Sequence, residues 1–448
     1  MTNVVFGAGS RRTVAPVLLV CVLGLAGGVL SPAAAVAGPG QVVQGSLPPV
    51  PTAGPGQQLT VTAVDVSPRG VVAGTLHVTT TNPDGTQSVA DLPQRWVRIP
   101  GAGWLRQGVA LPEGATSGTV TGLTDRGEAA GTVTLDGVLR AARWSASGRS
   151  ATLIGDAGSR VTAVGPNGPW GVFSGDGSPV VPGVAELVTR DGTRTLLSGT
   201  SELDAGYSRR VSSIGGPGLA LVWVIDGVGR ATTGRPVLWQ DGATVRLPVI
   251  DAALLTPACV SPVRADGSVV ASGYDTSAGV VSFVLIRHVG GAPGTDIVLN
   301  RAAAAGQPVA SLSCGSTRLS DSLAGDGGVA GFISDAEGQR AAYWNAANVA
   351  TVVPLAAGER SAAGVAVAGA GRMVIQAQGE DGTARLSLWQ DGIRTQLPAP
   401  DGWTVTSVVE LTDAGLLVAN VRDAAGTVRP AVWQLALRGV DVAVKPIG

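Results

Sequence analysis

The stretch LTDAGLLVANVRDAAGTVRPAVW, residues 411–433, shows the unit from which most of this chain is built. A turn at 413–415 separates two short apolar runs, and a second turn at 423–426 leads to a third run that ends at Trp433. Valine-rich runs joined by tight glycine turns are typical of consecutive antiparallel strands. The unit therefore predicts a β-meander, whose fourth strand we expect at 440–444.

The unit returns about every 48 residues, an interval typical of propellers and other repeat arrays. Both faces of its strands are apolar, as in Leu386-Ser387-Leu388-Trp389, which indicates sheets covered on both sides. Four-stranded meanders stacked around an axis form propeller blades. We predict an all-β fold, a β-propeller of four-stranded antiparallel blades over 59–448, with eight blades favoured and seven left open. In six units the third strand ends at a tryptophan, and in the other two Thr189 and a residue near Arg287 take its place. The tryptophans are Trp96, Trp144, Trp239, Trp344, Trp389 and Trp433.

Two further features recur in the unit. Asp-Gly pairs at 191–192, 241–242 and 391–392 predict two-residue hairpin turns. An arginine stands four residues before the tryptophan, on the same face of the strand. Its recurrence indicates a structural role, either stacking on a tryptophan or pairing with a turn aspartate as a joint between blades; a ring of arginines around an anion is the alternative. These arginines are Arg140, Arg235, Arg340, Arg385 and Arg429.

The segment 411–419, followed by Arg-Pro-Ala-Val-Trp at 429–433, resembles the bacterial extracellular repeats called the HAF family. Those repeats combine an Asn-Asp-x-Gly turn, a valine-rich strand and a His-Ala-Phe-Leu-Trp strand before an Asp-Gly hairpin. Here Arg-Ala-Ala-Tyr-Trp at 340–344 takes the place of the His-Ala-Phe triplet. The resemblance implies an exported, propeller-like protein and no particular activity.

The first residues have the features of an export signal. Arg11 and Arg12 precede an apolar stretch at 15–30, and Ala-Val-Ala at 35–37 is a small-x-small cleavage site. We expect a signal peptide over 1–37, with an uncleaved anchor as the alternative, and a secreted or cell-envelope location. A Pro/Gly-rich linker is expected over 38–58. No membrane span is expected once the signal is removed.

Composition excludes some functions. The net charge is -1, only 14% of the residues are charged, and no block of like charges occurs. The basic surface that nucleic-acid binding requires is therefore missing. The two histidines, His77 and His288, are far apart and are expected to be surface or turn residues. Without metal-ligand spacing or a nucleophile motif, we expect no metal, no cofactor and no catalytic residue.

Two cysteines remain after the signal, Cys259 and Cys314. Both fall early in successive units, and an exported protein occupies a compartment that permits disulfides. We hypothesise a disulfide between neighbouring blades, with two buried free thiols as the alternative. Most aspartates lie in turns, where their side chains bond the local backbone.

Aromatic residues outside the repeated position are candidates for stacking on a ligand. Packing between blades is the alternative role for each of them. They are Trp104, Trp170, Trp223, Trp403, Tyr207 and Tyr274.

No chemistry is concentrated at one point of the sequence. We therefore expect a monomeric, secreted, non-enzymatic propeller that binds a ligand or partner, such as a glycan or an envelope protein. The alternative is a carbohydrate-active enzyme, a glycosidase or lyase, with a carboxylate pair at the propeller channel. Two carboxylates facing each other about 5–10 Å apart in one pocket would favour the enzyme.

Overall fold

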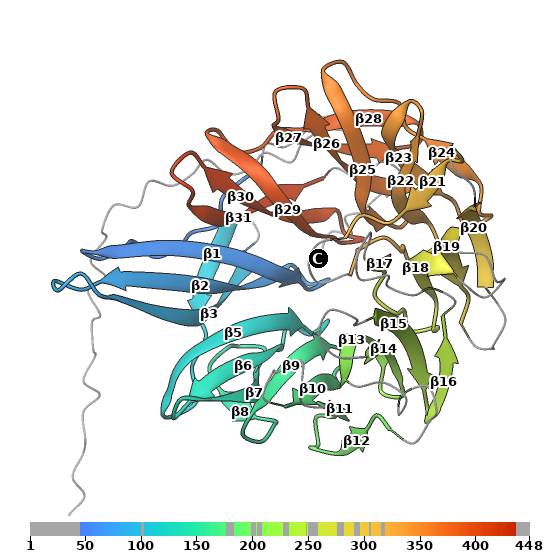
Figure 1. Cartoon of the computed structure of the whole chain (residues 1–448). Helices are drawn as coiled ribbons and strands as arrows, with labels where there is room; N and C mark the ends of the chain where they lie inside the picture. Colours follow the sequence, from blue (N-terminus) through green and yellow to red (C-terminus); the bar gives the residue numbers. More distant parts are fainter. Residues whose placement is uncertain are drawn as a thin grey trace, which may run out of the picture. The chain divides into compact units, whose positions relative to one another are not determined.

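Eight antiparallel sheets form a ring of blades around a central channel (Figure 1). The computed structural model describes residues 45–99, 103–175, 183–198, 203, 208–226, 233–247, 249, 259–275, 282–290, 296–303, 306–314 and 319–435. The prediction of an all-β, eight-bladed propeller with four-stranded antiparallel blades is confirmed. No helix in the described part of the chain is long and apolar enough to cross a membrane.

Each blade is a meander whose first strand lies at the channel and whose last strand lies at the rim (Figure 1). Blades 1 to 4 consist of β1 (Gln57–Val66), β2 (Val71–Thr81), β3 (Gln87–Ile99), β4 (Gly103–Gly108); β5 (Ala115–Leu123), β6 (Ala129–Leu135), β7 (Val138–Trp144), β8 (Ala151–Leu153); β9 (Ser159–Val164), β10 (Trp170–Ser174), β11 (Val184–Val188), β12 (Arg194–Leu196); β13 (Ser208–Gly216), β14 (Leu219–Asp226), β15 (Thr233–Gln240) and β16 (Ala243–Arg246).

Blades 5 to 8 repeat this order. They consist of β17 (Cys259–Val260), β18 (Val269–Asp275), β19 (Ser282–His288), β20 (Asp296–Ala302); β21 (Val309–Ser311), β22 (Val329–Asp335), β23 (Gly338–Trp344), β24 (Ala350–Val352); β25 (Glu359–Ala368), β26 (Arg372–Gly379), β27 (Ala384–Gln390), β28 (Ile393–Leu397); β29 (Trp403–Leu411), β30 (Leu416–Asp423) and β31 (Val428–Gln434).

The repeated tryptophans form the core between blades. All six are at most 8% exposed. The indole N–H of Trp96 donates to the Pro49 carbonyl at 2.7 Å, and that of Trp433 donates to the Pro398 carbonyl at 2.8 Å. Each ring thus buries its apolar face while its polar atom stays paired, which is how a tryptophan gains most from burial.

A glycine turn joins the first and second strands of most blades. In blade 2, the Gly127 N–H donates to the Thr124 carbonyl at 2.8 Å, and Gly127 has a φ of 80°. Glycine adopts this left-handed conformation without the steric penalty of a Cβ atom. Gly327 and Gly415 make the same turn in blades 6 and 8. The glycine before each of these second strands is therefore needed for the positive φ of the turn.

The ring is closed by the N-terminal segment. Ser46 pairs with Val432 of β31 through two backbone hydrogen bonds of 2.9 Å, in the place of a fourth strand beside β31. Gly45 lies so close to Trp433 that an added Cβ would stand 2.5 Å from the indole ring. The expected fourth strand at 440–444 lies outside the described residues, as does the expected signal peptide.

The hairpin prediction is correct at two positions and wrong at one. Asp241 and Asp391 have φ values of 47° and 52°, and each is followed by a glycine of positive φ. At 191–192 the loop is longer, because Val188 pairs with Arg194. There the Asp191 carboxylate accepts hydrogen bonds from the Thr189 hydroxyl and the Thr193 N–H, which stabilise a wider turn.

The recurring arginines contact groups of the predicted kinds. Arg340 pairs with Asp335 at 2.6 Å and Arg385 with Asp381 at 2.9 Å. Arg429 stacks on Trp403, with 5.8 Å between the guanidinium carbon and the ring centroid. Each of these three contacts lies within a single blade, so the expected joint between blades is wrong for all three arginines.

A disulfide joins Cys259 of β17 to Cys314, which follows β21. The two Cα atoms are 6.0 Å apart, and the bond links blades 5 and 6.

Candidate functional site in the central channel

The channel contains a cavity of 1340 Å³ that residues from all eight blades line. Residues in the first strands, or shortly after them as in blades 5 and 6, supply most of the wall. A space of this size and position is where a propeller can enclose a ligand. It is therefore the candidate functional site.

A β-bulge in several first strands turns one side chain into the channel. In β1 the pairing with β2 skips Val64, and in β5 it skips Thr121. The same irregularity skips Val365 in β25 and Val409 in β29. A bulge adds one residue to a strand and re-aims its side chain. All four residues line the cavity.

The residue after the bulge is small in some blades and acidic in two. Gly122 and Ala366 occupy this position in blades 2 and 7, as the pairing with the second strands shows. Asp65 takes it in blade 1 and Glu410 in blade 8. These two blades are neighbours across the closure of the ring (Figure 1). The two acids therefore come together at that seam.

Asp65 connects blade 1 to blade 2. Its Oδ2 atom accepts a hydrogen bond from the Leu123 N–H at 2.6 Å, and its Oδ1 atom accepts one from the Val66 N–H at 2.7 Å. The carboxylate reaches blade 2 across Gly122, where an added Cβ would stand 3.1 Å from Oδ2. The small residue in blade 2 thus makes room for the acid from blade 1.

Glu410 lies in blade 8 at its seam with blade 1. Its carboxyl group lines the cavity beside that of Asp65 in blade 1. Two ionised carboxylates that lie close together repel each other, so the nearness of Asp65 favours the protonated form of Glu410.

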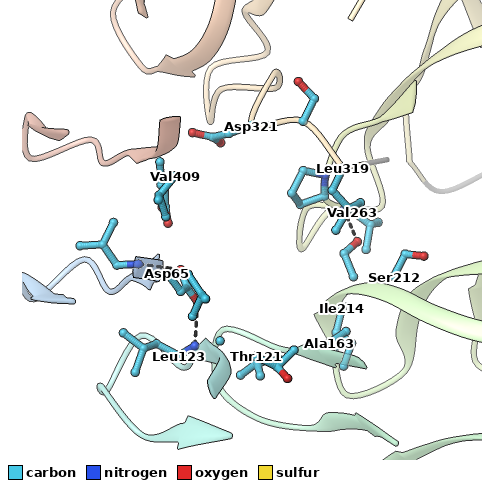
Figure 2. Close-up of a pocket in the computed structure, with 18 of the residues that line it drawn as sticks. Asp65, Thr121, Leu123, Ala163, Ser212, Ile214, Val263, Leu319, Asp321 and Val409 are labelled. Carbon is cyan, nitrogen blue, oxygen red and sulfur yellow. Dashed lines mark hydrogen bonds between the residues drawn. The ribbon is translucent and has the colours of Figure 1, made fainter. Parts of the chain in front are cut away.

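Asp321 connects blade 6 to blade 8. Its Oδ2 atom accepts a hydrogen bond from the Leu411 N–H at 3.2 Å, while its carbonyl accepts one from Val367 in blade 7 at 2.9 Å. Figure 2 shows Asp321 and Asp65 on different sides of the pocket, with Val409 between them. We call Asp321, Glu410 and Asp65 the carboxyl relay.

The surroundings favour protonation of the relay. All three residues are half-buried, because the channel reaches them from one side only. Burial raises the pKa of Glu410 well above its usual value, and the charges of Asp65 and Asp321 raise it further. Burial raises the pKa of Asp321 to about 7, against the lowering effect of the Leu411 N–H and Arg264. Burial also raises the pKa of Asp65.

The opposite wall of the cavity is largely apolar. Ile214, Val263 and Leu319 lie there (Figure 2), and Trp223 also lines the cavity. Two cations also line the channel, Arg210 in blade 4 and Arg264 after β17. The site therefore combines an acidic side with an apolar side.

Of the predicted stacking residues that the structure describes, only Trp223 lines the cavity. It is 7% exposed, whereas Trp170 is fully buried beneath Arg143. Tyr274 packs edge-on against Phe283, with ring centroids 5.4 Å apart. Trp104 lies in β4 and Trp403 begins β29. Tyr207 lies outside the described residues, and ligand stacking by any of these side chains stays a prediction.

The expectation that both histidines are surface or turn residues is wrong for His288. Its side chain is 1% exposed at the end of β19, where Nδ1 contacts Asp296 at 2.8 Å. The carboxylate gives the imidazole a partner and makes its burial tolerable. His77 is 37% exposed in β2 and contacts Asp91 at 2.7 Å.

The residues of the carboxyl relay were missed by the sequence reasoning. The sequence nevertheless contains a pattern that could have identified two of them. Asp65 and Glu410 each place an acid in a valine-rich first strand, in Ala-Val-Asp-Val and Val-Val-Glu-Leu. Aligning the first strands of the units would have placed both acids at one position. Among the described residues, no group of three histidine, cysteine or acidic side chains is arranged to hold a metal ion.

Solved structures resemble the chain at the level of the fold. An acylaminoacyl peptidase from Pyrococcus horikoshii is 11% identical with a TM-score of 0.42, and the match covers 82% of this chain and 58% of the peptidase. Dipeptidyl peptidase 4 from Porphyromonas gingivalis is 9% identical with a TM-score of 0.43, and the match covers 79% of this chain and 57% of that peptidase. TolB from Acinetobacter baumannii is 12% identical with a TM-score of 0.29, and the match covers 84% of this chain and 82% of TolB.

The chain thus spans little more than half the length of these peptidases. No family model and no curated protein matches the sequence. The resemblance to HAF repeats stays a prediction, and these similarities concern the propeller fold alone.

Proposed function

We propose that this chain is a secreted, non-enzymatic β-propeller that binds a polyhydroxylated ligand, such as a glycan segment, in its central channel. The observation that carries the proposal is the shared cavity, which the carboxyl relay and Trp223 both line. Carboxyl groups accept hydrogen bonds from hydroxyls, and an indole adds apolar contact area. The Cys259–Cys314 disulfide and the signal-like first residues support an extracytoplasmic location.

A glycan array followed by titration calorimetry tests this function. The glycan with the strongest signal is titrated into the wild type and into Val64→Trp, which fills the channel from a bulge position. Val89→Trp is the matched control, because Val89 lies in the same blade and is 69% exposed. We expect Val64→Trp to lose binding and Val89→Trp to retain it. Equal binding by both variants would place the ligand outside the channel.

The carbohydrate-active enzyme is a second candidate, because Asp321 and Asp65 lie on different sides of one cavity (Figure 2). Asp65 and Glu410 cannot themselves flank a glycosidic bond, since their carboxyl groups lie beside each other. Asp321, with a pKa raised to about 7 mainly by burial, has the protonation state of a general acid. Chromatography of the bound glycan after incubation separates the candidates: released product that disappears in Asp321→Asn would establish the enzyme.

A further inference from the structure

In six blades the described first strand contains a β-bulge at the same register. The residue before the bulge always pairs two positions beyond the second-strand residue that pairs with the end of the third strand. In blade 2, for example, Ala129 pairs with Trp144 and Gly131 with Val120. Since a bulge re-aims the side chain that the pairing skips, six side chains enter the channel at one level. All six line the cavity, and they are Val64, Thr121, Thr162, Ser212, Val365 and Val409.

These six positions divide the ring by polarity. Blades 2, 3 and 4 each contribute a hydroxyl to form what we call the hydroxyl arc, which consists of Thr121, Thr162 and Ser212. Blades 7, 8 and 1 follow one another across the closure of the ring and form the valine arc, which consists of Val365, Val409 and Val64. Figure 2 shows Val409 and Ser212 on different sides of the pocket. At this level the channel is therefore amphipathic.

The hydroxyl arc provides both acceptors and donors. Thr121 Oγ1 donates to the Val161 carbonyl at 3.1 Å, and a hydroxyl that donates still has lone pairs with which to accept. Arg210 precedes Ser212 by two residues, is exposed and lines the cavity, so its guanidinium adds N–H donors to this side. The arc thus matches the hydroxyls of a sugar, each of which donates and accepts.

The valine arc presents methyl groups to the channel. Val64 lies in a first strand and is nevertheless 37% exposed, because it faces the cavity. The carboxylate of the next residue, Asp65, accepts the Leu123 N–H at 2.6 Å and is thereby directed toward blade 2. A ligand hydroxyl placed against these valines loses its hydrogen bonds to water without replacement, which is unfavourable. A methyl group in the same place gains from burial.

We propose that the ligand of the channel is a sugar with a methyl group on one edge, bound with its hydroxyls against the hydroxyl arc and its methyl group against the valine arc. This inference rests on the proposed function and narrows the class of glycan. The methyl group of a 6-deoxyhexose and that of an O-acetyl ester have this chemistry in common. An unsubstituted hexose instead places a hydroxymethyl group against valine.

Titration calorimetry with matched glycosides tests the proposal. The probes are methyl α-L-mannopyranoside, its 6-deoxy counterpart and its 6-O-acetyl ester, together with the same set in the galacto configuration. We expect a methyl-bearing probe to bind about tenfold more tightly than its parent hexoside in at least one configuration, because an unpaired hydroxyl in an apolar contact costs about that factor. The tighter of the two methyl-bearing probes distinguishes the deoxy sugar from the ester. Equal affinities, preference for the parent hexoside, or no binding by any probe would overturn the proposal.

Val409→Thr is the decisive variant, because it places a hydroxyl in the valine arc. We expect the preference for the methyl-bearing probe to fall from about tenfold to near equality. Val89→Thr, at a position in blade 1 that is 69% exposed, is the matched control and should keep the wild-type preference. An unchanged preference in Val409→Thr would refute the proposal. If that variant does not fold, Val365→Thr makes the same change in blade 7 and is judged by the same criterion.

The outcomes separate this inference from the proposed function. Binding of hexose glycans that is lost in Val64→Trp, without a preference for the methyl-bearing probes, would leave the function in place and overturn the inference. If no glycan on the array shows binding that depends on the channel, both are overturned.

Discussion

The seam between blades 5 and 6 and the seam between blades 8 and 1 are held together by different chemistry. The first contains the Cys259–Cys314 disulfide and the hydroxyl contact of Ser272 with Ser311 at 3.0 Å. The second contains the adjacent acids Glu410 and Asp65, and Asn420, whose side chain bonds the backbone of blade 1. One seam thus contains a covalent cross-link, and the other contains two neighbouring acids whose pKa values burial raises.

Removing the disulfide should have the largest effect on the first seam. The bond closes a loop of 55 residues, and the chain-entropy model assigns such a loop about 4 kcal/mol. We expect Cys259→Ala with Cys314→Ala to lower the free energy of unfolding by that amount in urea titrations.

A reductant should destabilise the wild type to the same extent and leave the double variant unchanged. Equal stability of the oxidised wild type and the double variant would mean that the bond does not hold this seam.

Replacing Asn420 should weaken the second seam by a smaller amount. Its side chain accepts from the Ala63 N–H at 2.8 Å and donates to the Ala63 carbonyl at 3.1 Å. Asn420→Ala leaves both buried groups without a partner, at a cost of roughly 2–4 kcal/mol. Urea titration measures the loss, and Asn82→Ala in an exposed turn is the control. Equal stability of the two variants would show that Asn420 does not join the blades.

The smallest effect is expected away from both seams. Arg385 pairs with Asp381 in an exposed hairpin of blade 7. The Thr383 hydroxyl and N–H, more than Arg385, lower the pKa of Asp381 to about 2. Arg385→Ala should therefore shift the midpoint of thermal unfolding by only about 2 °C or less. A shift as large as that of Asn420→Ala would mean that the recurring arginine does more than complete its hairpin.

The regular part of the fold was predictable because it repeats. Trp433 and its equivalents mark the blade interfaces, and Gly415 and its equivalents mark turns that only a positive φ allows. Such local requirements recur in every unit and so become visible in one sequence. The closing bridge between Ser46 and Val432 does not recur, since it joins positions 386 residues apart.

The site was less predictable because it arises where the repeat is broken. Asp65 and Glu410 show their shared position only after the first strands are aligned at their bulges. Asp321 belongs to no named strand and reaches Leu411 past blade 7, so its place depends on the closed ring. Trp223 was selected for its departure from the repeat, yet only the structure shows that it lines the channel.

The most direct test of the carboxyl relay is the free energy of unfolding of the oxidised wild type between pH 5 and pH 8 at constant ionic strength. Glu410 and Asp321 have raised pKa values in the folded state, so the folded protein holds protons that the unfolded chain has already released near pH 4. Stability must then decrease as pH rises through this range. Groups with lowered pKa values, such as Asp381, titrate below it. A continuous decrease from pH 5 to pH 8 is the predicted result, and a stability that is constant or increases over this range would contradict the burial of protonated acids in the relay.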